Sequence, residues 1–304
     1  MLAEILEIIF NTISPIFLVI GVAALVDRRF QPDPQGLSRL VIYVFTPALV
    51  LDGLANSDVG GDEAVQLITV SVVMMIAVAG IAYGVTRLLG FERMQASAFI
   101  LAATMINAGN YGYPLNEFAF GPAGAERAII FFVGTVVMSN TLGVYLASLG
   151  SASARQALVN VFIVPLPYAA VLGLGINVTG TEMPVPIARA VAVLSDAAIP
   201  GMLMVLGIQL SRTKLDRGRL RPVLAAAGMR LLVGPLVAVV LVLVLGMSGT
   251  TRQVAIVQSA MPTAVLSGVL ATEFGSDAEF VTSTILASTL LSIATLSVLL
   301  AILM

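Results

Sequence analysis

The amino-acid sequence predicts an all-α integral membrane protein of ten transmembrane helices, in two inverted five-helix repeats whose fourth and ninth helices are broken and cross. Composition predicts the membrane class. Of 304 residues, 59% are hydrophobic and 11% charged, whereas a soluble domain has about 25% charged residues, and the mean hydropathy is +1.03. Because a spanning helix needs about 20 residues, the chain has room for roughly ten spans and almost no soluble domain.

Apolar runs separated by charges, Pro and Gly clusters predict where the ten spans lie. Acids (Glu4 and Glu7) precede the first span and no small-residue cleavage site follows it, so we expect it to be retained rather than removed as a signal peptide. The predicted spans run approximately from Ile5 to Val26, Leu37 to Leu54, Ala64 to Leu89, Gln95 to Phe118, Ala128 to Leu149, Ala157 to Ile176, Pro186 to Leu210, Leu220 to Leu245, Arg252 to Phe274 and Phe280 to Met304.

The residue inventory argues against several classes of protein. There is no Cys and no His, which excludes disulfides, thiolate nucleophiles, imidazole bases and the common haem and zinc sites, so we expect neither metal nor cofactor. An intramembrane serine protease needs a His base. An aspartyl protease needs paired Asp in a Gly-Asp context, which Asp52 and Asp196 lack. The net charge of −2 provides no basic surface for nucleic acid. We therefore expect no enzyme.

Loop charges predict the orientation in the membrane. Three basic residues, Arg127, Arg189 and Arg252, lie on one predicted side, Arg230 lies inside a span, and the other eleven share the opposite side. The positive-inside rule makes the richer side cytoplasmic. An even number of spans then places both termini outside the cytoplasm, in a multi-pass protein of the cell membrane. The eleven are Arg28, Arg29, Arg39, Arg87, Arg93, Arg155, Arg212, Lys214, Arg217, Arg219 and Arg221.

Prolines recur at matching places in the two halves. Their near-equal separations predict a duplication, with one repeat over residues 1–150 and another over 151–304. Five spans in each repeat is an odd number, so the second copy enters the membrane from the opposite side, as in many secondary transporters. The alternative is that Pro is simply frequent in transmembrane helices. The pairs are Pro15 with Pro165 (150 residues apart), Pro47 with Pro200 (153) and Pro114 with Pro262 (148).

Span four contains a run that disfavours a regular helix, Asn107-Ala108-Gly109-Asn110-Tyr111-Gly112-Tyr113-Pro114. Glycine permits unwinding, and Pro114 lacks an N–H and clashes with the preceding turn. Unwound backbone is tolerated in hydrocarbon only where it lines a protein-enclosed cavity. We therefore predict a half-helix, an unwound stretch, and a second half-helix opening at Pro114, a favoured first position.

Span nine carries a matching interruption with fewer signals, because its one Pro, without Gly, is also compatible with a kink. If both helices break and cross, their two N-terminal ends together hold about one negative charge. The predicted site for a small anion combines both segments, although the same polar residues also serve to hold helices together in many membrane proteins. Its residues are Asn107, Asn110, Tyr111, Gly112, Pro114, Gln258, Ser259, Pro262 and Thr263.

Asp196 and Arg230 are the charges predicted near the middle of spans seven and eight. A carboxylate inside a membrane is costly and is a functional hypothesis by default, so Asp196 is a candidate proton site. It is equally well explained as a structural residue, either protonated or bound to Arg230. No Asp or Glu lies in the middle of spans four and nine. Since hard cations prefer such oxygens, the sequence mildly disfavours sodium coupling.

Several motifs follow one another along nearly the whole chain. They are Pro15-Ile16-Phe17-Leu18, Leu37-Ser38-Arg39-Leu40-Val41 leading to Pro47-Ala48-Leu49, the Asn107 to Leu115 break, Met261-Pro262-Thr263-Ala264-Val265 leading to Glu273-Phe274-Gly275, and Thr284 to Leu296. In this order and spacing they resemble the auxin efflux carrier family in its short bacterial form. Between spans five and six only residues 150–156 are hydrophilic, unlike in the long plant carriers, and Val265 and Leu266 stand where bacterial relatives often have Asn.

The resemblance implies an architecture related to the bile acid symporters. Spans three to five and eight to ten form a transport domain, which moves against a scaffold of spans one, two, six and seven that also forms a homodimer. Similar proteins carry small organic anions such as auxin or dicarboxylates. We therefore expect a secondary transporter of a small organic anion in the lipid bilayer, with an elevator-type mechanism. A non-transporting receptor on the same fold and a sodium-coupled symporter are the alternatives.

Overall fold

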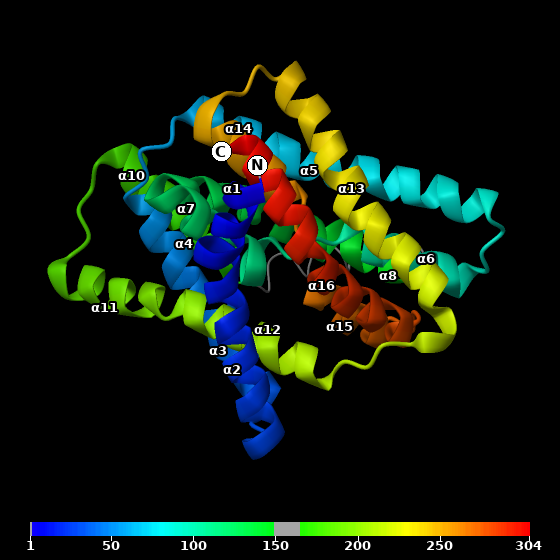
Figure 1. Ribbon diagram of the computed structural model, residues 1–304. Helices are drawn as coiled ribbons and strands as arrows, with labels where there is room; N and C mark the ends of the chain where they lie inside the picture. Colours follow the sequence, from blue (N-terminus) through cyan, green and yellow to red (C-terminus); the bar gives the residue numbers. More distant parts are fainter. Residues whose placement is uncertain (1, 149–164) are drawn as a thin grey trace.

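The computed structural model describes residues 2–148 and 165–304, and its regular structure in these ranges is helical apart from one isolated antiparallel bridge between Ile106 and Thr263 (Figure 1). Short π-helical or 3-10 turns join some helices: η1 (Ile9–Ile13), η2 (Val41–Phe45), η3 (Ala108–Gly112), η4 (Ser139–Gly143) and η5 (Arg217–Arg219). The helices are α1 (Leu2–Ile8), α2 (Ser14–Phe30), α3 (Pro34–Leu40), α4 (Thr46–Ala55), α5 (Gly61–Leu88), α6 (Arg93–Thr104), α7 (Tyr113–Met138), α8 (Val144–Ser148), α10 (Leu166–Thr179), α11 (Val185–Asp196), α12 (Ala198–Arg212), α13 (Leu220–Val244), α14 (Gly249–Ser259), α15 (Val265–Glu273) and α16 (Ala278–Leu303).

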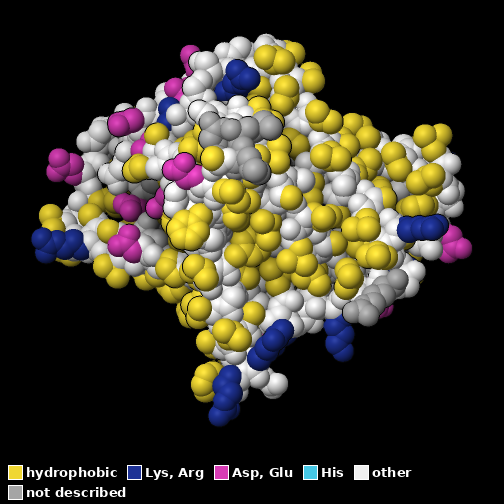
Figure 2. All heavy atoms as spheres, in the orientation of Figure 1, with side chains coloured by type: hydrophobic (Ala, Val, Ile, Leu, Met, Phe, Trp, Pro, Cys, Tyr) yellow, Lys and Arg dark blue, Asp and Glu magenta, His cyan; other side chains and the backbone are white. Residues whose placement is uncertain are grey.

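Length and hydropathy identify membrane-spanning helices. Within the described residues, seven helical stretches are long and apolar enough to cross a bilayer. Large apolar side chains such as Phe10, Leu88 and Val178 are more than 70% exposed, and Figure 2 shows apolar side chains across the middle of the visible surface. A soluble monomer rarely exposes so large an apolar area. The prediction of an all-helical, multi-pass membrane protein is therefore confirmed. The seven stretches are Ile5–Phe30, Pro34–Ala55, Gly61–Leu88, Ala108–Ala147, Val185–Arg212, Leu220–Val244 and Ala278–Leu303.

Two predicted segments lie partly or wholly outside the described residues. The sixth predicted span, Ala157 to Ile176, is seen only from residue 165, where its end forms part of α10. The predicted hydrophilic linker, Gly150 to Gln156, lies outside. The predicted boundary between the repeats, at residues 150 and 151, lies outside as well.

The stretch Ala108–Ala147 is 40 residues long, or about 60 Å as a straight helix, which is twice the hydrocarbon thickness. It does not run straight. Gly121 has φ +65° and ψ −159° inside α7, and Pro122 follows it. Glycine adopts this backbone conformation without steric cost, and Pro is favoured in the first turn of the helix that resumes. The break coincides with the predicted boundary between spans four and five.

Aspartate side chains cap the starts of two helices. The Asp33 carboxylate accepts hydrogen bonds from the N–H groups of Gln35 and Gly36, both at 3.0 Å, which caps α3 ahead of its first residue, Pro34. Asp277 caps α16 in the same way by accepting from the N–H of Phe280 at 3.0 Å. Both caps satisfy N–H groups that a helix leaves unpaired at its start.

The helices pack in two groups. The first consists of α2, α3, α4, α10, α11 and α12, in which α2 packs on α12, and α4 on α10 and α11. The second consists of α5 to α8 and α13 to α16, in which α13 contacts α5, α6, α14 and α16. Contacts between the groups involve α4 and α10 with α7, and α12 with η3. Helix α1 and the turn η1, which lead into α2, also contact α16. Two glycines let first-group helices approach closely, as is common in membranes: Gly173 faces the Leu51 carbonyl, and Gly207 faces that of Ile20.

Ion pairs tie helix ends together. Arg127 of α7 binds Glu63 of α5, with Nη2 2.8 Å from the carboxylate, and Nε donates to the Thr251 hydroxyl of α14 at 2.7 Å. Arg212 of α12 donates from Nη2 to the Asp27 carboxylate of α2 at 2.6 Å. These contacts join α5, α7 and α14 in one case, and α2 and α12 in the other.

Arg219 binds Asp216 and Asp277 and thereby joins the start of α13 to the start of α16. The guanidinium, together with the N–H of Gly218, holds the pKa of the Asp216 carboxyl below its usual range. These charged residues lie at the edge of the second group of helices, where they fix α13 to α16.

We predict that Gly207→Ala destabilises the protein and that Gly21→Ala does not. A methyl group at Gly207 collides with the Ile20 carbonyl and Ala23 across the α2–α12 contact, whereas one at Gly21, on α2, meets nothing within 4 Å. Overpacking costs about 1–3 kcal/mol, and Ala is the better helix former by about 1 kcal/mol. Thermal unfolding of the purified protein checks this. Equal melting temperatures for the two variants would contradict the close α2–α12 approach.

Candidate functional site

The first break separates α6 from α7. Helix α6 ends at Thr104, Met105 is extended with φ −76° and ψ 125°, and a π-helical turn, η3, begins at Ala108. The Gly112 N–H donates to the Asn107 carbonyl at 2.9 Å, which closes the turn. Helix α7 then opens at Tyr113 with Pro114 in its first turn, where Pro needs no N–H partner. The unwound part is therefore shorter and earlier than predicted, because the two glycines form a wide turn instead of extended chain.

The second break separates α14 from α15. Helix α14 ends at Ser259, and α15 begins at Val265, with Ala264 extended before it. Pro262 lies between them and cannot continue a helix of the preceding residues. The sequence alone was compatible with either a kink or a break, and the structure has a break between Ser259 and Val265.

The two breaks cross as extended chain. The Asn107 N–H donates to the Pro262 carbonyl at 2.9 Å, and the Ala264 N–H donates to the Met105 carbonyl at 3.0 Å. The Thr263 hydroxyl donates to the Ala102 carbonyl at 2.9 Å. These bonds satisfy backbone groups that have no partner in hydrocarbon, so each broken segment completes the other.

Two buried amides at the crossing keep unpaired atoms. Among the described residues, nothing bonds to Nδ2 of Asn107 or to Oε1 of Gln258. Nε2 of Gln258 is 3.4 Å from the Ala108 carbonyl and 3.5 Å from that of Ala128, which are long hydrogen bonds. Gly112 lies against Gln258, where a Cβ would collide with Oε1. An unpaired buried polar atom costs about 1–3 kcal/mol, which marks these amides as candidates for ligand binding.

The other predicted site residues divide between the crossing and its surroundings. Asn110 is partly exposed in η3. Ser259 bonds back to the Ala255 carbonyl of its own helix at 2.7 Å. Tyr111 is fully buried and contacts Phe17 edge-on, with ring centroids 5.9 Å apart. Tyr111 therefore lies against α2. The predicted site residues that meet at the crossing are Asn107, Gly112, Gln258, Pro262 and Thr263.

Arg230 and Asp196 lie apart. Asp196 is exposed at the end of α11. The Arg230 side chain is fully buried, and its guanidinium donates to the carbonyls of Ala103, Thr104 and Ser259. The explanation of Asp196 as the ion-pair partner of Arg230 is therefore wrong, because the guanidinium turns to helix-end carbonyls instead.

A cavity of about 200 Å³ lies between α4, α7 and α11, and no residue of either break lines it. Its lining includes three acids, Asp52, Glu117 and Glu126, together with Tyr113 and Ser195. Carboxylates repel an ionised acid, so this cavity does not suit an organic anion, whereas the helix starts at the crossing do.

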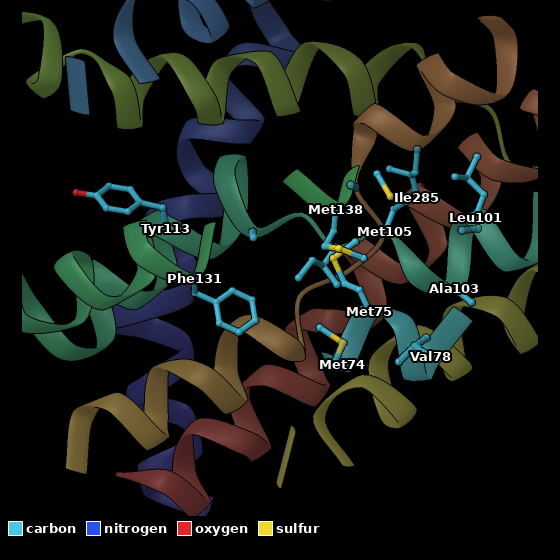
Figure 3. Close-up of a cluster of buried hydrophobic side chains, with 14 of the residues drawn as sticks. Met74, Met75, Val78, Leu101, Ala103, Met105, Tyr113, Phe131, Met138 and Ile285 are labelled. Carbon is cyan, nitrogen blue, oxygen red and sulfur yellow. The ribbon is translucent and has the colours of Figure 1, made fainter. Parts of the chain in front are cut away.

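Sequence reasoning missed two groups of residues around the crossing. Several Ser and Thr residues of α16 are buried, among them Ser288, whose hydroxyl accepts from the Thr263 N–H at 3.1 Å. Thr284, Ser288 and Ser292 are four residues apart and therefore lie on one face of the helix, a pattern that is visible in the sequence. Figure 3 shows the second group, in which Met74, Met75, Met105 and Met138 gather with Ala103 and Ile285. Methionine side chains are flexible and adapt to changing shapes.

A family model described as membrane transport protein matches residues 8–153 and 147–300. The chain belongs to this family of membrane transporters, which includes the auxin efflux carriers, and the resemblance noted in the sequence is confirmed.

Relatives from three kinds of organism support the assignment. An uncharacterized transporter of Methanothermobacter thermautotrophicus is 32% identical over 268 residues, 88% of each chain. A putative malonate transporter of Rhizobium meliloti is 25% identical over 97% of this chain and 95% of its own. Auxin efflux carrier component 1 of Arabidopsis thaliana is 32% identical over 114 residues, 37% of this chain and 18% of that protein. The full-length similarity is thus to compact microbial transporters.

We predict that Gln258→Met leaves stability unchanged or raises it by about 1 kcal/mol, while Thr263→Val lowers it by a similar amount. The first replacement removes a buried amide whose hydrogen bonds are absent or long, and the second removes the hydroxyl bonded to Ala102. Chemical or thermal unfolding of the two purified variants checks this. A large loss of stability in Gln258→Met would show that the amide holds the helices together.

Proposed function

We propose that the protein is a secondary transporter that binds a small organic anion at the crossing of the two broken helices and moves it across the membrane by alternating access. The observation that carries this proposal is the pair of helix starts, at Ala108 and Val265, beside the unpaired amides of Asn107 and Gln258. Each helix start is equivalent to roughly +0.5 charge. The first N–H groups of a helix lack intrahelical partners and bind anions readily.

The proposed architecture is ten transmembrane helices in two inverted repeats, residues 1–150 and 151–304. It is supported by the equivalent breaks, at residues 105–107 and 260–264, each between two half-helices. The family model also matches one segment in each half of the chain. An odd number of helices per repeat inverts the second copy, which is what brings two helix starts to one place.

The two groups of packed helices support a division into a scaffold and a transport domain. The scaffold contains α2 to α4 and α10 to α12, and the transport domain contains α5 to α8 and α13 to α16. The whole crossing belongs to the transport domain, so an elevator movement carries the site intact past the scaffold. Exposed apolar side chains on α10 and α11, such as Val171 and Ile187, fit a homodimer interface on the scaffold.

Carboxylates are the substrate class that we propose, in a protein of the cell membrane with both termini outside the cytoplasm. One relative is named as a putative malonate transporter and another as an auxin efflux carrier component. An anion that is held by helix starts and amides, with no direct salt bridge to a cationic side chain, dissociates readily. A receptor on the same fold is the other candidate, and transport into liposomes separates the two.

We predict that carboxylates, but not the corresponding amides, stabilise the purified protein, and that Asn107→Leu removes this effect. The helix starts favour negative charge, and losing one hydrogen bond to a charged ligand costs about 1.5–3 kcal/mol, or roughly tenfold to 150-fold in affinity. Thermal shifts with malonate and malonamide, and with a panel of mono- and dicarboxylates and their amides, measure it.

The control is Asn140→Leu, since the Asn140 amide bonds to the Val136 carbonyl of its own helix at 2.9 Å. It should bind as the native protein does. Equal shifts from an acid and its amide would contradict the anion site, and stabilisation without flux into liposomes would favour the receptor.

We also predict that a Cys added after Met304 reacts with an impermeant maleimide in intact cells. The uneven distribution of Lys and Arg supports an orientation with both termini outside, and the native chain has no Cys to react instead. A Cys placed at Arg217, on the opposite predicted side, is the control and should react only after lysis. The reverse pattern would invert the topology.

A further inference from the structure

Arg230 of α13 is a buried cation that none of the above functions uses. Its side chain is fully buried, and among residues 2–148 and 165–304 no Asp or Glu forms an ion pair with it. A charge at this depth is costly and needs compensation by other groups. The compensation comes from backbone.

The guanidinium contacts the C-terminal ends of both first half-helices. Nη1 donates to the carbonyls of Ala103 and Thr104, each at 3.2 Å, which are the last two residues of α6. Nη2 donates to the carbonyl of Ser259, the last residue of α14. These carbonyls have no intrahelical partner, and each helix end is equivalent to roughly −0.5 charge. One guanidinium therefore balances two helix ends.

The neighbouring residues pack closely around the guanidinium of Arg230. Gly234 lies one turn after Arg230, and a Cβ there would overlap Nη2 of Arg230 and approach the Ser259 carbonyl. Sulfur of Met74 lies 4.0 Å from Nη2. The guanidinium thus occupies a close-fitting place between α6, α13 and α14, and Gly234 is required for it.

The charges of the crossing sum to zero without Arg230. Two helix starts contribute about +1 and two helix ends about −1. In other transporters, unwound carbonyls and half-helix ends of this kind bind a coupling sodium ion or proton. Here three carbonyls that could serve a mobile cation are already bound to a side chain.

We propose that Arg230 is a fixed substitute for a coupling cation: its guanidinium neutralises the two half-helix ends, gives the crossing its net positive charge, and makes anion binding independent of sodium. The proposal rests on the proposed anion site. The proposal has one consequence that distinguishes it from a structural role. When the Arg230 side chain is removed, a free cation can replace it, whereas a free cation cannot replace a residue that only holds helices together.

The test uses the purified full-length protein and the variants Arg230→Ala and Arg230→Met. Guanidinium chloride at millimolar concentration is the probe, compared with sodium, potassium and choline chloride at equal ionic strength. The readouts are the melting temperature and the affinity for the carboxylate that stabilises the native protein most. Arg230→Ala leaves room for guanidinium, whereas the Met side chain fills part of it.

We expect the native protein to bind the carboxylate equally in sodium and choline. Arg230→Ala should bind it at least about tenfold more weakly, as loss of one nearby charge implies, and guanidinium should raise both its melting temperature and its affinity to within about threefold of native. Arg230→Met should not respond. Partial rescue of Arg230→Ala by sodium also supports the proposal, because the emptied carbonyls, with the unpaired Thr104 hydroxyl, are ligands for a hard cation.

A second pair of variants keeps the charge. Gly234→Ala displaces the guanidinium, while Gly228→Ala, on the same helix, adds a methyl with nothing within 4 Å. Gly234→Ala should weaken carboxylate binding and Gly228→Ala should not. If Arg230→Ala folds only when guanidinium is present during purification, the proposal is supported.

Four results would overturn it: sodium-dependent binding by the native protein, native affinity in Arg230→Ala, no response of Arg230→Ala to guanidinium or sodium, or equal binding by the two glycine variants. If no carboxylate stabilises the native protein, the anion site fails. The melting temperature of Arg230→Ala with and without guanidinium then still decides the role of Arg230.

Discussion

Hydrocarbon offers no hydrogen-bond partners, and this constraint governs the centre of the protein. Wherever a helix is interrupted at membrane depth, its carbonyls and N–H groups must be satisfied by other protein groups. The bonds between Asn107 and Pro262 and between Ala264 and Met105 meet this requirement for the extended chain, and Arg230 meets it for the ends of α6 and α14. The helix starts at Ala108 and Val265 differ, because the first N–H groups of a helix have no intrahelical partner, and the polarity of the crossing follows from that difference.

The same constraint explains which parts of the site were predictable. Asn, Gly and Pro in one run, and a lone Pro in the other, predicted both interruptions because these residues change the backbone directly. The end of α6 at Thr104 has no such marker, since Met105 and Ile106 are ordinary apolar residues. Their extended conformation is set by pairing with Ala264 and Thr263, about 160 residues away, and a single sequence does not reveal that pairing.

The partner of Arg230 was hidden for a related reason. A sequence shows side-chain charges, so an intramembrane Arg and an intramembrane Asp invite pairing, but the dipole of a helix end carries no residue type. Asp196 lies exposed at the end of α11, while three carbonyls accept the hydrogen bonds of Arg230. The sequence carries one sign of this arrangement, Gly234, which lies one turn after Arg230 and leaves room for its guanidinium.

The position of Arg230 on α13 has a further consequence for transport. Helix α13 packs with α5, α6, α14 and α16, so in the proposed elevator movement the fixed charge travels with the crossing. The empty site then carries about +1 and the site loaded with a monocarboxylate about zero, from the sum of helix ends and guanidinium. A unit charge that crosses the full membrane potential changes the free energy by about 2.3 kcal/mol per 100 mV. The membrane potential therefore acts mainly on the return of the empty site, and a potential that is negative inside favours the inward-facing empty state, ready to collect an anion from the cytoplasm.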